Sequence, residues 1–227
     1  FETKSSLHRH IPEFLDSLYR FQRSEETSYD LIHSHYWLSG AAGMKLSEEW
    51  DVPHYTTFHT LAKTKMQARP GEKESRLRIA TETAVMTSVD AIVVSTEQER
   101  EVLSRLYEVS PNKTRVISAG VDLELFKPID KADARSSLGL TEEKIVLSVG
   151  RIEPLKGLDV LIGAMSRLES LDDTRLVIIG GQPGQDRELE RLKSMARTLG
   201  LSDKVTFTGA MDQTDLPAYY SAADVFV

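Results

Sequence analysis

Short apolar segments alternate with amphipathic segments along most of the chain. Three apolar segments are nearly continuous runs of β-branched and aliphatic residues, at 91–94, 145–149 and 176–179. Such runs are typical of strands that are buried on both faces of a parallel sheet. The pattern predicts strands at Leu31–Ser34, His54–Phe58, Ala91–Ser95, Arg115–Ser118, Ile145–Val149, Leu176–Ile179, Val205–Thr208 and Asp224–Val227.

The segments between these strands carry apolar residues at helical spacing, most clearly within 158–168 and 189–199. Gly200 stands where a glycine commonly ends a helix. Strand–helix alternation predicts an α/β fold with doubly wound parallel sheets. The alternation breaks between Ala119 and Leu140, in a polar segment that contains Pro128. We therefore expect two domains, residues 1–130 and 131–227.

The composition narrows the class of protein. Of 227 residues, 40% are hydrophobic, and 28 basic against 35 acidic residues give a net charge of −7. This balance argues against a general nucleic-acid or anionic-membrane binder. The absence of cysteine excludes disulfides, thiolate metal sites and thiol nucleophiles. Since no apolar run could span a bilayer and no signal peptide is recognisable, we expect a soluble, cytoplasmic protein.

Both ends of the sequence indicate an internal piece of a longer protein. The sequence opens on Phe1 and closes on an apolar strand pattern at 223–227 that nothing covers. We expect this piece by itself to be poorly soluble or inactive.

Polar, basic or glycine-rich residues follow several of the predicted strands. In open α/β sheets ligands bind beyond the carboxyl ends of the strands, so these residues are candidates for holding a polar, phosphate-bearing ligand. Arg151 and Lys156 flank a turn that contains Pro154, and Gly157 opens the next helix. Two cations beside a helix N-terminus would hold a diphosphate. Spacing alone leaves a solvated surface loop as the alternative.

Several ordered blocks resemble the retaining family 4 glycosyltransferases. These blocks are His33-Ser34-His35, Thr57–Thr60, Ser95–Glu99, Gly120-Val121-Asp122, Gly150-Arg151, Lys156-Gly157-Leu158-Asp159, Gly180-Gly181 and Tyr219–Val227. They look most like the sucrose-phosphate synthase and D-inositol-3-phosphate glycosyltransferase branch, over about residues 29–227. The resemblance implies the GT-B fold, in which one Rossmann-like domain binds mainly the acceptor and a second binds the nucleotide-sugar.

The resemblance also implies a reaction, in which a sugar passes with retained configuration from a nucleoside-diphosphate sugar, such as a UDP-sugar, to an acceptor hydroxyl. Arg151 and Lys156 would stabilise the departing diphosphate, and His59 would orient the donor sugar. The residues implied to bind the donor are Gly150, Arg151, Lys156, Gly180 and Gly181. No metal or cofactor is expected, and the sequence contains no Asp-x-Asp motif.

Family members carry further elements that this sequence does not contain. A glycine-rich loop would lie upstream of Phe1, and a pair of glutamates that contact the donor would lie beyond Val227. Their absence here adds to the expectation that the piece alone is inactive.

A basic stretch in the first half is implied to bind a phosphorylated acceptor. Between Thr60 and Ala80 there are six basic residues and two glutamates. The implied acceptor residues are Tyr36, Thr60, Lys65, Arg76 and Arg78. The alternative from spacing alone is that Glu72, Glu74 and Glu82 pair with these cations on the surface, where such pairs contribute little.

Histidines are concentrated after the first two predicted strands. His59 matches the family's active-site histidine, although a histidine at a strand end is often structural. We expect His33 and His35 to face opposite sides of their strand, so that a metal pair is not expected. Tyr219 and Tyr220 are expected on a short helix that covers the sheet.

Two other functions remain open at this point. One is a GT-B epimerase or phosphorylase; an epimerase would need carboxylate acid–base residues, which this sequence does not exclude. The other is a non-catalytic nucleotide-sugar binding module, which nothing in the sequence favours. In each case the expected partners are small molecules.

Overall fold

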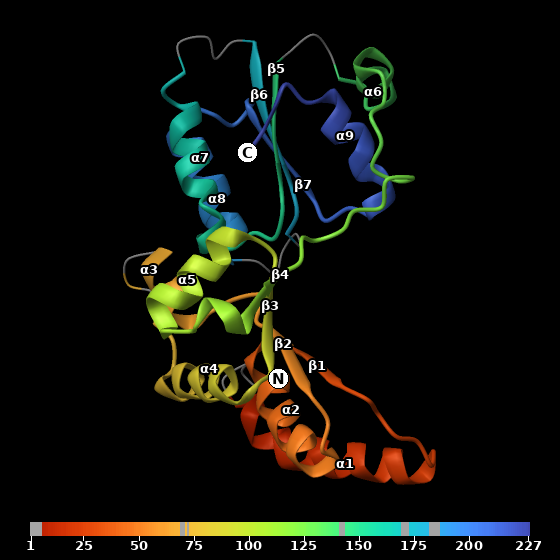
Figure 1. Cartoon of the computed structure of the whole chain (residues 1–227). Helices are drawn as coiled ribbons and strands as arrows, with labels where there is room; N and C mark the ends of the chain where they lie inside the picture. The colour runs from red at the N-terminus through yellow and green to blue at the C-terminus, as the bar shows by residue number, and fades with distance from the viewer. Residues whose placement is uncertain (1–5, 69–70, 72, 141–143, 169–172, 182–186) are drawn as a thin grey trace. The chain divides into compact units, whose positions relative to one another are not determined.

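In the computed structural model, each half of the chain is a parallel sheet with helices packed against it (Figure 1). The structure describes residues 6–68, 71, 73–140, 144–168, 173–181 and 187–227. The chain divides into two compact units, Phe1–Gly120 and Val121–Val227. This division falls earlier in the chain than the expected boundary at residue 130.

The first unit contains a four-stranded sheet in the order β1-β2-β3-β4. All of its strand pairs are parallel. The strands are β1 (Ile32–His35), β2 (His54–Thr57), β3 (Ala91–Val94) and β4 (Thr114–Val116). The helices are η1 (Leu7–His10), α1 (Ile11–Ser24), α2 (Tyr36–Trp50), α3 (Ala62–Ala68), α4 (Arg76–Ser88), α5 (Glu97–Tyr107) and η2 (Pro111–Lys113).

The second unit contains a four-stranded parallel sheet in the order β7-β6-β5-β8. Its strands are β5 (Lys144–Val149), β6 (Thr174–Ile179), β7 (Val205–Gly209) and β8 (Val225–Phe226). Its helices are α6 (Lys131–Ser137), η3 (Pro154–Lys156), α7 (Leu158–Met165), α8 (Arg187–Thr198), η4 (Gln213–Asp215) and α9 (Leu216–Ala222). Figure 1 shows α7 and α8 on one side of this sheet and α6 and α9 on the other.

The predicted α/β class and doubly wound parallel sheets are confirmed. Each predicted strand forms within two residues of its expected bounds. The β-branched runs lie in the cores of the two sheets, where Ile92, Leu147 and Leu176 are fully buried. Gly200 follows α8 at a φ of 70°, as expected of a glycine at a helix end. Among the described residues, no helix has the length and apolar character that a membrane span requires.

The polar segment in which the domain boundary was expected contains the helix α6. The Asp130 carboxylate accepts hydrogen bonds from the backbone N–H groups of Ala132 and Asp133 and so caps this helix. Arg135 reaches the carbonyl oxygen of Ala222 and the carboxylate of Asp224. These long-range contacts hold a segment whose local pattern is only polar, so periodicity could not reveal it.

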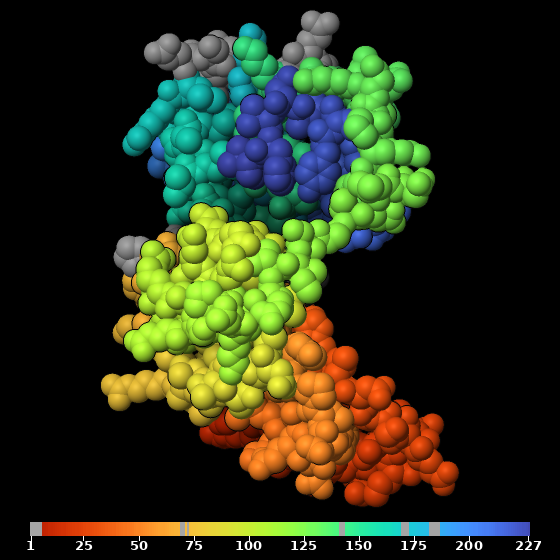
Figure 2. Space-filling view, in the orientation of Figure 1, coloured from red at the N-terminus to blue at the C-terminus, as the bar shows by residue number. Residues whose placement is uncertain are grey.

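The C-terminal strand lies at the edge of the second sheet, beside β5. Its apolar residues Val225, Phe226 and Val227 are 53%, 56% and 58% exposed. Figure 2 shows the C-terminal end of the chain, in dark blue, on the surface of the second unit.

His54 is a buried ionisable side chain at the start of β2. It is 1% exposed, and its Nε2 lies 2.7 Å from the Ser34 hydroxyl. Among the residues that the structure describes, its Nδ1 has no hydrogen-bond partner. Burial lowers the pKa of His54; the negative charge of Asp90 acts in the opposite direction, and His33 adds a smaller lowering. The neutral imidazole is therefore the form that the fold favours.

This burial predicts a loss of stability in mild acid. The unfolded histidine has a pKa of about 6.5, above that of the folded state. The stability is therefore complete above about pH 6.5 and declines below it, since the unfolded chain takes up the proton first. Urea unfolding followed by tryptophan fluorescence measures this, because Trp37 and Trp50, the chain's two tryptophans, both lie in the first unit.

The substitution His54→Gln should flatten this pH dependence, and His10→Gln, at an exposed position, should leave it unchanged. An equal acid slope in wild type and His54→Gln would show that another group is responsible.

Candidate active site

The carboxyl ends of β1 and β2 bring the predicted residues of the first unit together. The two strands pair in parallel, with His35 opposite Thr57. Tyr36 follows β1 directly, and His59 and Thr60 follow β2. Tyr36 and His59 have φ values of 76° and 59°. Non-glycine residues in this region are strained, and such strain clusters at functional sites.

Three histidine rings lie side by side at this edge. The Nδ1 of His35 is 2.8 Å from the Nε2 of His59, and the Nε2 of His33 is 3.0 Å from the Thr57 hydroxyl. The rings of His33 and His35 are 4.4 Å apart between centroids. The expectation that these two histidines face opposite sides is wrong, because residues two apart on a strand share a face.

The histidine cluster favours the neutral form of His33. Burial lowers the pKa of His33, and the neighbouring His35 and His59 lower it further. A neutral imidazole can donate from one nitrogen and accept at the other, as the bond between His35 and His59 requires. Within the part of the chain that the structure describes, no group of three or more histidine, cysteine, aspartate or glutamate residues is arranged to hold a metal ion.

Arg78 is the buried cation of this edge. Its Nη2 donates to the carbonyl oxygen of Thr60 at 3.0 Å and to the Thr60 hydroxyl at 3.2 Å. Its Cζ lies 5.1 Å from the centroid of the Tyr36 ring. The side chain is only 5% exposed. Although burial alone would lower the pKa of Arg78, hydrogen bonding to Glu82 and the charge of that carboxylate raise it, so the guanidinium stays charged.

Glu82 is a fully buried carboxylate that orients Arg78. It accepts from the Arg78 Nε at 2.7 Å, from the Tyr107 hydroxyl and, with both oxygens, from the backbone N–H of Ala62. One side chain thus joins the start of α3, the first turns of α4 and the end of α5. Burial and this hydrogen bond raise the pKa of Tyr107, so the phenol keeps its proton.

Lys65 and Arg78 meet at Glu74. The Glu74 Oε1 is 2.5 Å from the Lys65 Nζ and 2.9 Å from the Arg78 Nη1. The carboxylates of Glu74 and Glu82 do pair with the basic residues, as the alternative interpretation held, but the pairs are largely buried rather than on the surface. Glu72 lies outside the described residues.

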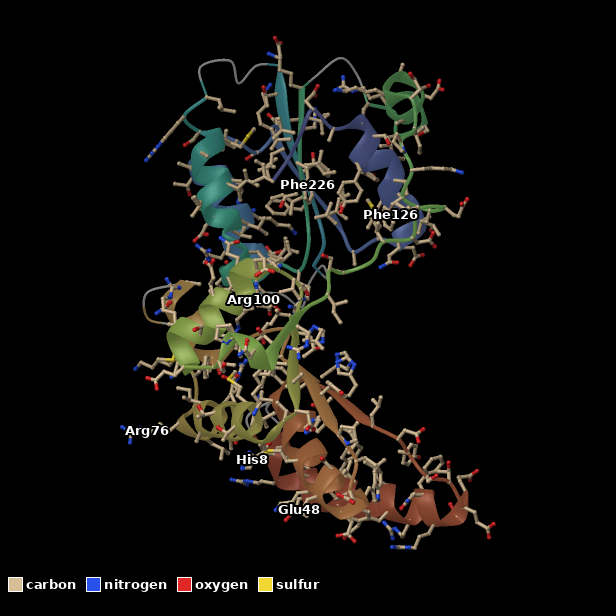
Figure 3. The ribbon with its side chains drawn as sticks, in the orientation of Figure 1. His8, Glu48, Arg76, Arg100, Phe126 and Phe226 are labelled. Atoms are coloured by element: carbon tan, nitrogen blue, oxygen red, sulfur yellow. The ribbon has the colours of Figure 1, made fainter. Side chains whose placement is uncertain are left out.

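Arg76 is separate from this group. It is exposed at the first turn of α4, and Figure 3 shows it projecting away from the body of the unit. The structure therefore brings together four of the five predicted acceptor residues: Tyr36, Thr60, Lys65 and Arg78.

In the second unit, the segment after β5 has the expected local shape. Arg151 is 70% exposed and bonds to Glu153 at 2.7 Å. Lys156 ends η3, and Gly157, at a φ of 67°, precedes α7. The Lys156 side chain is also exposed and has no ion-pair partner among the residues that the structure describes. Both cations are thus accessible beside the start of α7.

The glycines after β5 and β6 pack closely together. A Cβ on Gly180 would lie 1.8 Å from the carbonyl oxygen of Gly150, and one on Gly181 would lie 2.6 Å from the side chain of Ile152. Both glycines have positive φ, at 138° and 79°. Packing therefore requires glycine at both positions, whatever further contact their backbone makes with a ligand.

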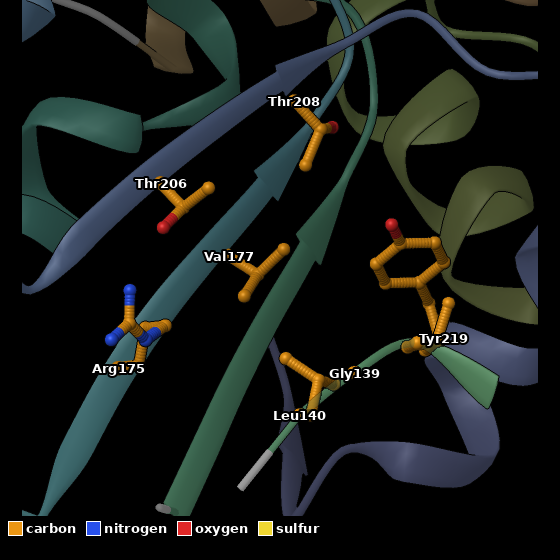
Figure 4. Close-up of a pocket in the computed structure, with 8 residues that line it drawn as sticks. Gly139, Leu140, Arg175, Val177, Thr206, Thr208 and Tyr219 are labelled. Atoms are coloured by element: carbon orange, nitrogen blue, oxygen red, sulfur yellow. The ribbon is translucent and has the colours of Figure 1, made fainter. Parts of the chain in front are cut away.

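A pocket of about 370 Å³ lies on one face of the second sheet (Figure 4). Arg175 and Val177 of β6 and Thr206 and Thr208 of β7 line it, since alternate strand residues share a face. Tyr219 of α9 covers its side, which agrees with the expectation that this helix covers the sheet. None of the predicted site residues lines this pocket.

Two sequence families match the chain. One, described as Glycosyltransferase Family 4, matches residues 3–125, and the other, described as Glycosyl transferases group 1, matches residues 130–227. The chain belongs to the family 4 glycosyltransferases. The resemblance inferred from the sequence blocks is thereby confirmed.

Curated relatives agree with this membership. D-inositol 3-phosphate glycosyltransferase of Stackebrandtia nassauensis is 40% identical over 98% of this chain. A second protein of this name, from Catenulispora acidiphila, is 38% identical over 99% of the chain. The chain spans about half the length of these relatives, 53% and 55%.

Solved structures confirm the GT-B fold. Sucrose-phosphate synthase of Thermosynechococcus elongatus matches the whole chain with a TM-score of 0.88 and 33% identity, and the match covers 56% of that protein. The HepE protein of Anabaena, solved with UDP-glucose, matches 95% of the chain with a TM-score of 0.74 and 19% identity, over 55% of its own length. The second match supports the fold alone.

From the sequence, Glu74 and Glu82 were expected only as surface partners of the basic residues, and neither His35 nor Tyr107 was expected among the site residues. A signal was present for the first two, because Glu74, Arg78 and Glu82 are spaced four residues apart, the spacing of neighbours on a helix. Nothing in the local sequence shows that Tyr107 reaches them from α5.

The buried position of Glu82 predicts a large effect of Glu82→Gln. The substitution removes the charge that balances Arg78, and breaking a buried ion pair costs about 3–5 kcal/mol. The free energy of unfolding of the first unit, followed by tryptophan fluorescence, should fall by about that amount. As a matched control, Glu101→Gln at an exposed position of α5 should change it by less than about 0.5 kcal/mol. A change below about 1 kcal/mol in Glu82→Gln would contradict the role given to this ion pair.

Proposed function

We propose that the protein containing this chain is a retaining glycosyltransferase. In this proposal it moves a sugar from a UDP-sugar to a hydroxyl of a sugar phosphate or inositol phosphate. Family membership supports the reaction class. The names of the 40% identical relative and of the 33% identical structure support a phosphorylated acceptor.

The observation that carries the acceptor class is the environment of Arg78. A guanidinium held over the Tyr36 ring and bonded to Thr60 stands at the carboxyl edge of the sheet, where ligands bind in this fold. Lys65 is joined to it through Glu74. Two cations and a hydroxyl suit a phosphate, since charge-assisted hydrogen bonds are the strong ones.

On the donor side, Arg151 and Lys156 would stabilise the leaving diphosphate. Negative charge builds on the diphosphate as the glycosidic bond breaks, and fixed cations beside it lower the barrier. Gly150, Gly180 and Gly181 would let the backbone approach the nucleotide. His59, held by His35, would orient the donor sugar, and the leaving phosphate would take the proton of the acceptor hydroxyl.

The substitution Arg78→Ala in the full-length protein should raise the KM for D-inositol 3-phosphate by about one to two orders of magnitude. The reason is the loss of charge-assisted bonds of about 1.5–3 kcal/mol. The KM for the UDP-sugar should hardly change. Because Arg78→Ala also leaves the buried Glu82 without its counter-charge, its urea unfolding curve must show that the variant is folded under the assay conditions. An equal rise in both KM values would contradict the assignment to the acceptor.

The substitutions Arg151→Ala and Lys156→Ala should each lower kcat by about 10²- to 10³-fold, the effect of losing one preorganised group that stabilises developing negative charge. Circular dichroism should show the fold unchanged, since both side chains are exposed. A kcat within about threefold of wild type in both variants would contradict the assignment of Arg151 and Lys156 to the diphosphate.

The reaction class is tested by offering UDP-sugars to the full-length protein with and without D-inositol 3-phosphate. The proposal expects UDP release that depends on the acceptor, and a product that keeps the anomeric configuration of the donor by NMR. Conversion of the donor without acceptor would indicate an epimerase, and release of a sugar 1-phosphate would indicate a phosphorylase.

A further inference from the structure

Glu74 stands between the two cations in the way that a phosphate oxygen would. A single oxygen, Oε1, accepts from both the Lys65 Nζ and the Arg78 Nη1. The Glu74 side chain is 13% exposed, and burial by itself would raise its pKa. The hydrogen bond from Lys65 and the charge of Arg78 outweigh burial, so that the pKa of Glu74 is lowered and the group is a carboxylate at neutral pH.

The other contacts of Arg78 fix its place and leave one direction for an anion. The Nε is bound to the fully buried Glu82, and the Nη2 is bound to both oxygens of Thr60. The Nη1 points to Glu74. An anion that binds Arg78 without breaking the buried pair or the bonds to Thr60 must therefore approach the Nη1, where the Glu74 carboxylate already accepts from one of the two N–H groups.

Glu74 can leave this position without disrupting the fold. It precedes Ser75, which caps α4, and therefore lies outside the helix that carries Arg78. Neither of its side-chain contacts involves the backbone of a helix or strand. By contrast, Glu82 holds the N–H of Ala62 and is fully buried. Of the two carboxylates on Arg78, Glu74 is the one that a ligand can replace.

We propose that Glu74 is an internal counter-ion that occupies the phosphate position of the acceptor subsite and determines its specificity. The inference rests on the proposed function. A phosphate monoester carries a charge of about −1.5 to −2 at pH 7 and offers three oxygens, so it can displace one carboxylate from the two cations. A neutral hydroxyl compound cannot, and Glu74 thereby excludes unphosphorylated acceptors from this position.

The test is the affinity of the full-length protein for D-inositol 3-phosphate and for inorganic phosphate, measured by calorimetry. The substitution Glu74→Gln keeps the shape and removes the competing charge. It should lower the Kd of both anions by about two- to fivefold, the upper part of the range expected for a partly exposed ion pair. Glu74→Ala should also lower both Kd values. This second variant shows that the tighter binding does not come from a new hydrogen bond made by the glutamine amide.

Glu101→Gln is the matched control and should leave both Kd values unchanged. The opposite role, in which Glu74 merely positions Lys65 and Arg78 for the ligand, predicts weaker binding in Glu74→Gln. A Kd that rises, or that stays within about twofold of wild type in both Glu74 variants, overturns the inference.

Failure of the inference is distinguishable from failure of the proposed function. If wild type binds the two anions and Arg78→Ala, shown to be folded by its urea unfolding curve, does not, while Glu74→Gln binds no more tightly, only the role of Glu74 is wrong. If wild type binds neither anion, the phosphorylated acceptor and the role of Glu74 are both overturned.

Discussion

The buried ion pair between Arg78 and Glu82 is the interaction on which the candidate acceptor site depends. An uncompensated charge in a protein interior is strongly destabilising, so each group fixes the other. Glu82 also binds the first N–H of α3 and the Tyr107 hydroxyl at the end of α5. The guanidinium is consequently held with little freedom beside Thr60 and Tyr36. A cation that is fixed before the ligand arrives loses little conformational entropy on binding.

The parallel sheet of the first unit is the second feature that fixes the positions of the site residues. Parallel strands end at one edge, and the residues that follow β1 and β2 therefore meet there although they are distant in the sequence. The backbone at Tyr36 and His59 has positive φ. Neither residue is at the C-terminal cap of a helix, where positive φ is common. Strain of this kind persists only where the surroundings enforce it. His59 is bonded here to His35, and the ring of Tyr36 lies under Arg78.

The sequence was sufficient for the fold because the central strands carry strong local patterns, at 91–94, 145–149 and 176–179. Runs such as 145–149 and 176–179 are short and rich in β-branched residues, which is typical of strands in the middle of a parallel sheet. Local pattern did not suffice for α6, which depends on the contacts of Arg135 with Ala222 and Asp224. Local pattern also did not suffice for the hydrogen bonds that join Arg78, Glu82 and Tyr107, because Tyr107 lies on a different helix, α5. The orientation of His33 and His35 was predictable, because residues two apart on a strand lie on the same face. The expectation that they face opposite sides contradicted this periodicity.

Discrimination between phosphorylated and unphosphorylated acceptors tests the central claim most directly. The measurement is kcat/KM of the full-length protein, with a UDP-sugar donor, for D-inositol 3-phosphate against inositol and for a hexose phosphate against the same hexose. A fixed Arg78 guanidinium that recognises phosphate predicts a preference of at least about 10²-fold for the phosphorylated member of one pair. Equal efficiency for both members of each pair would contradict the account.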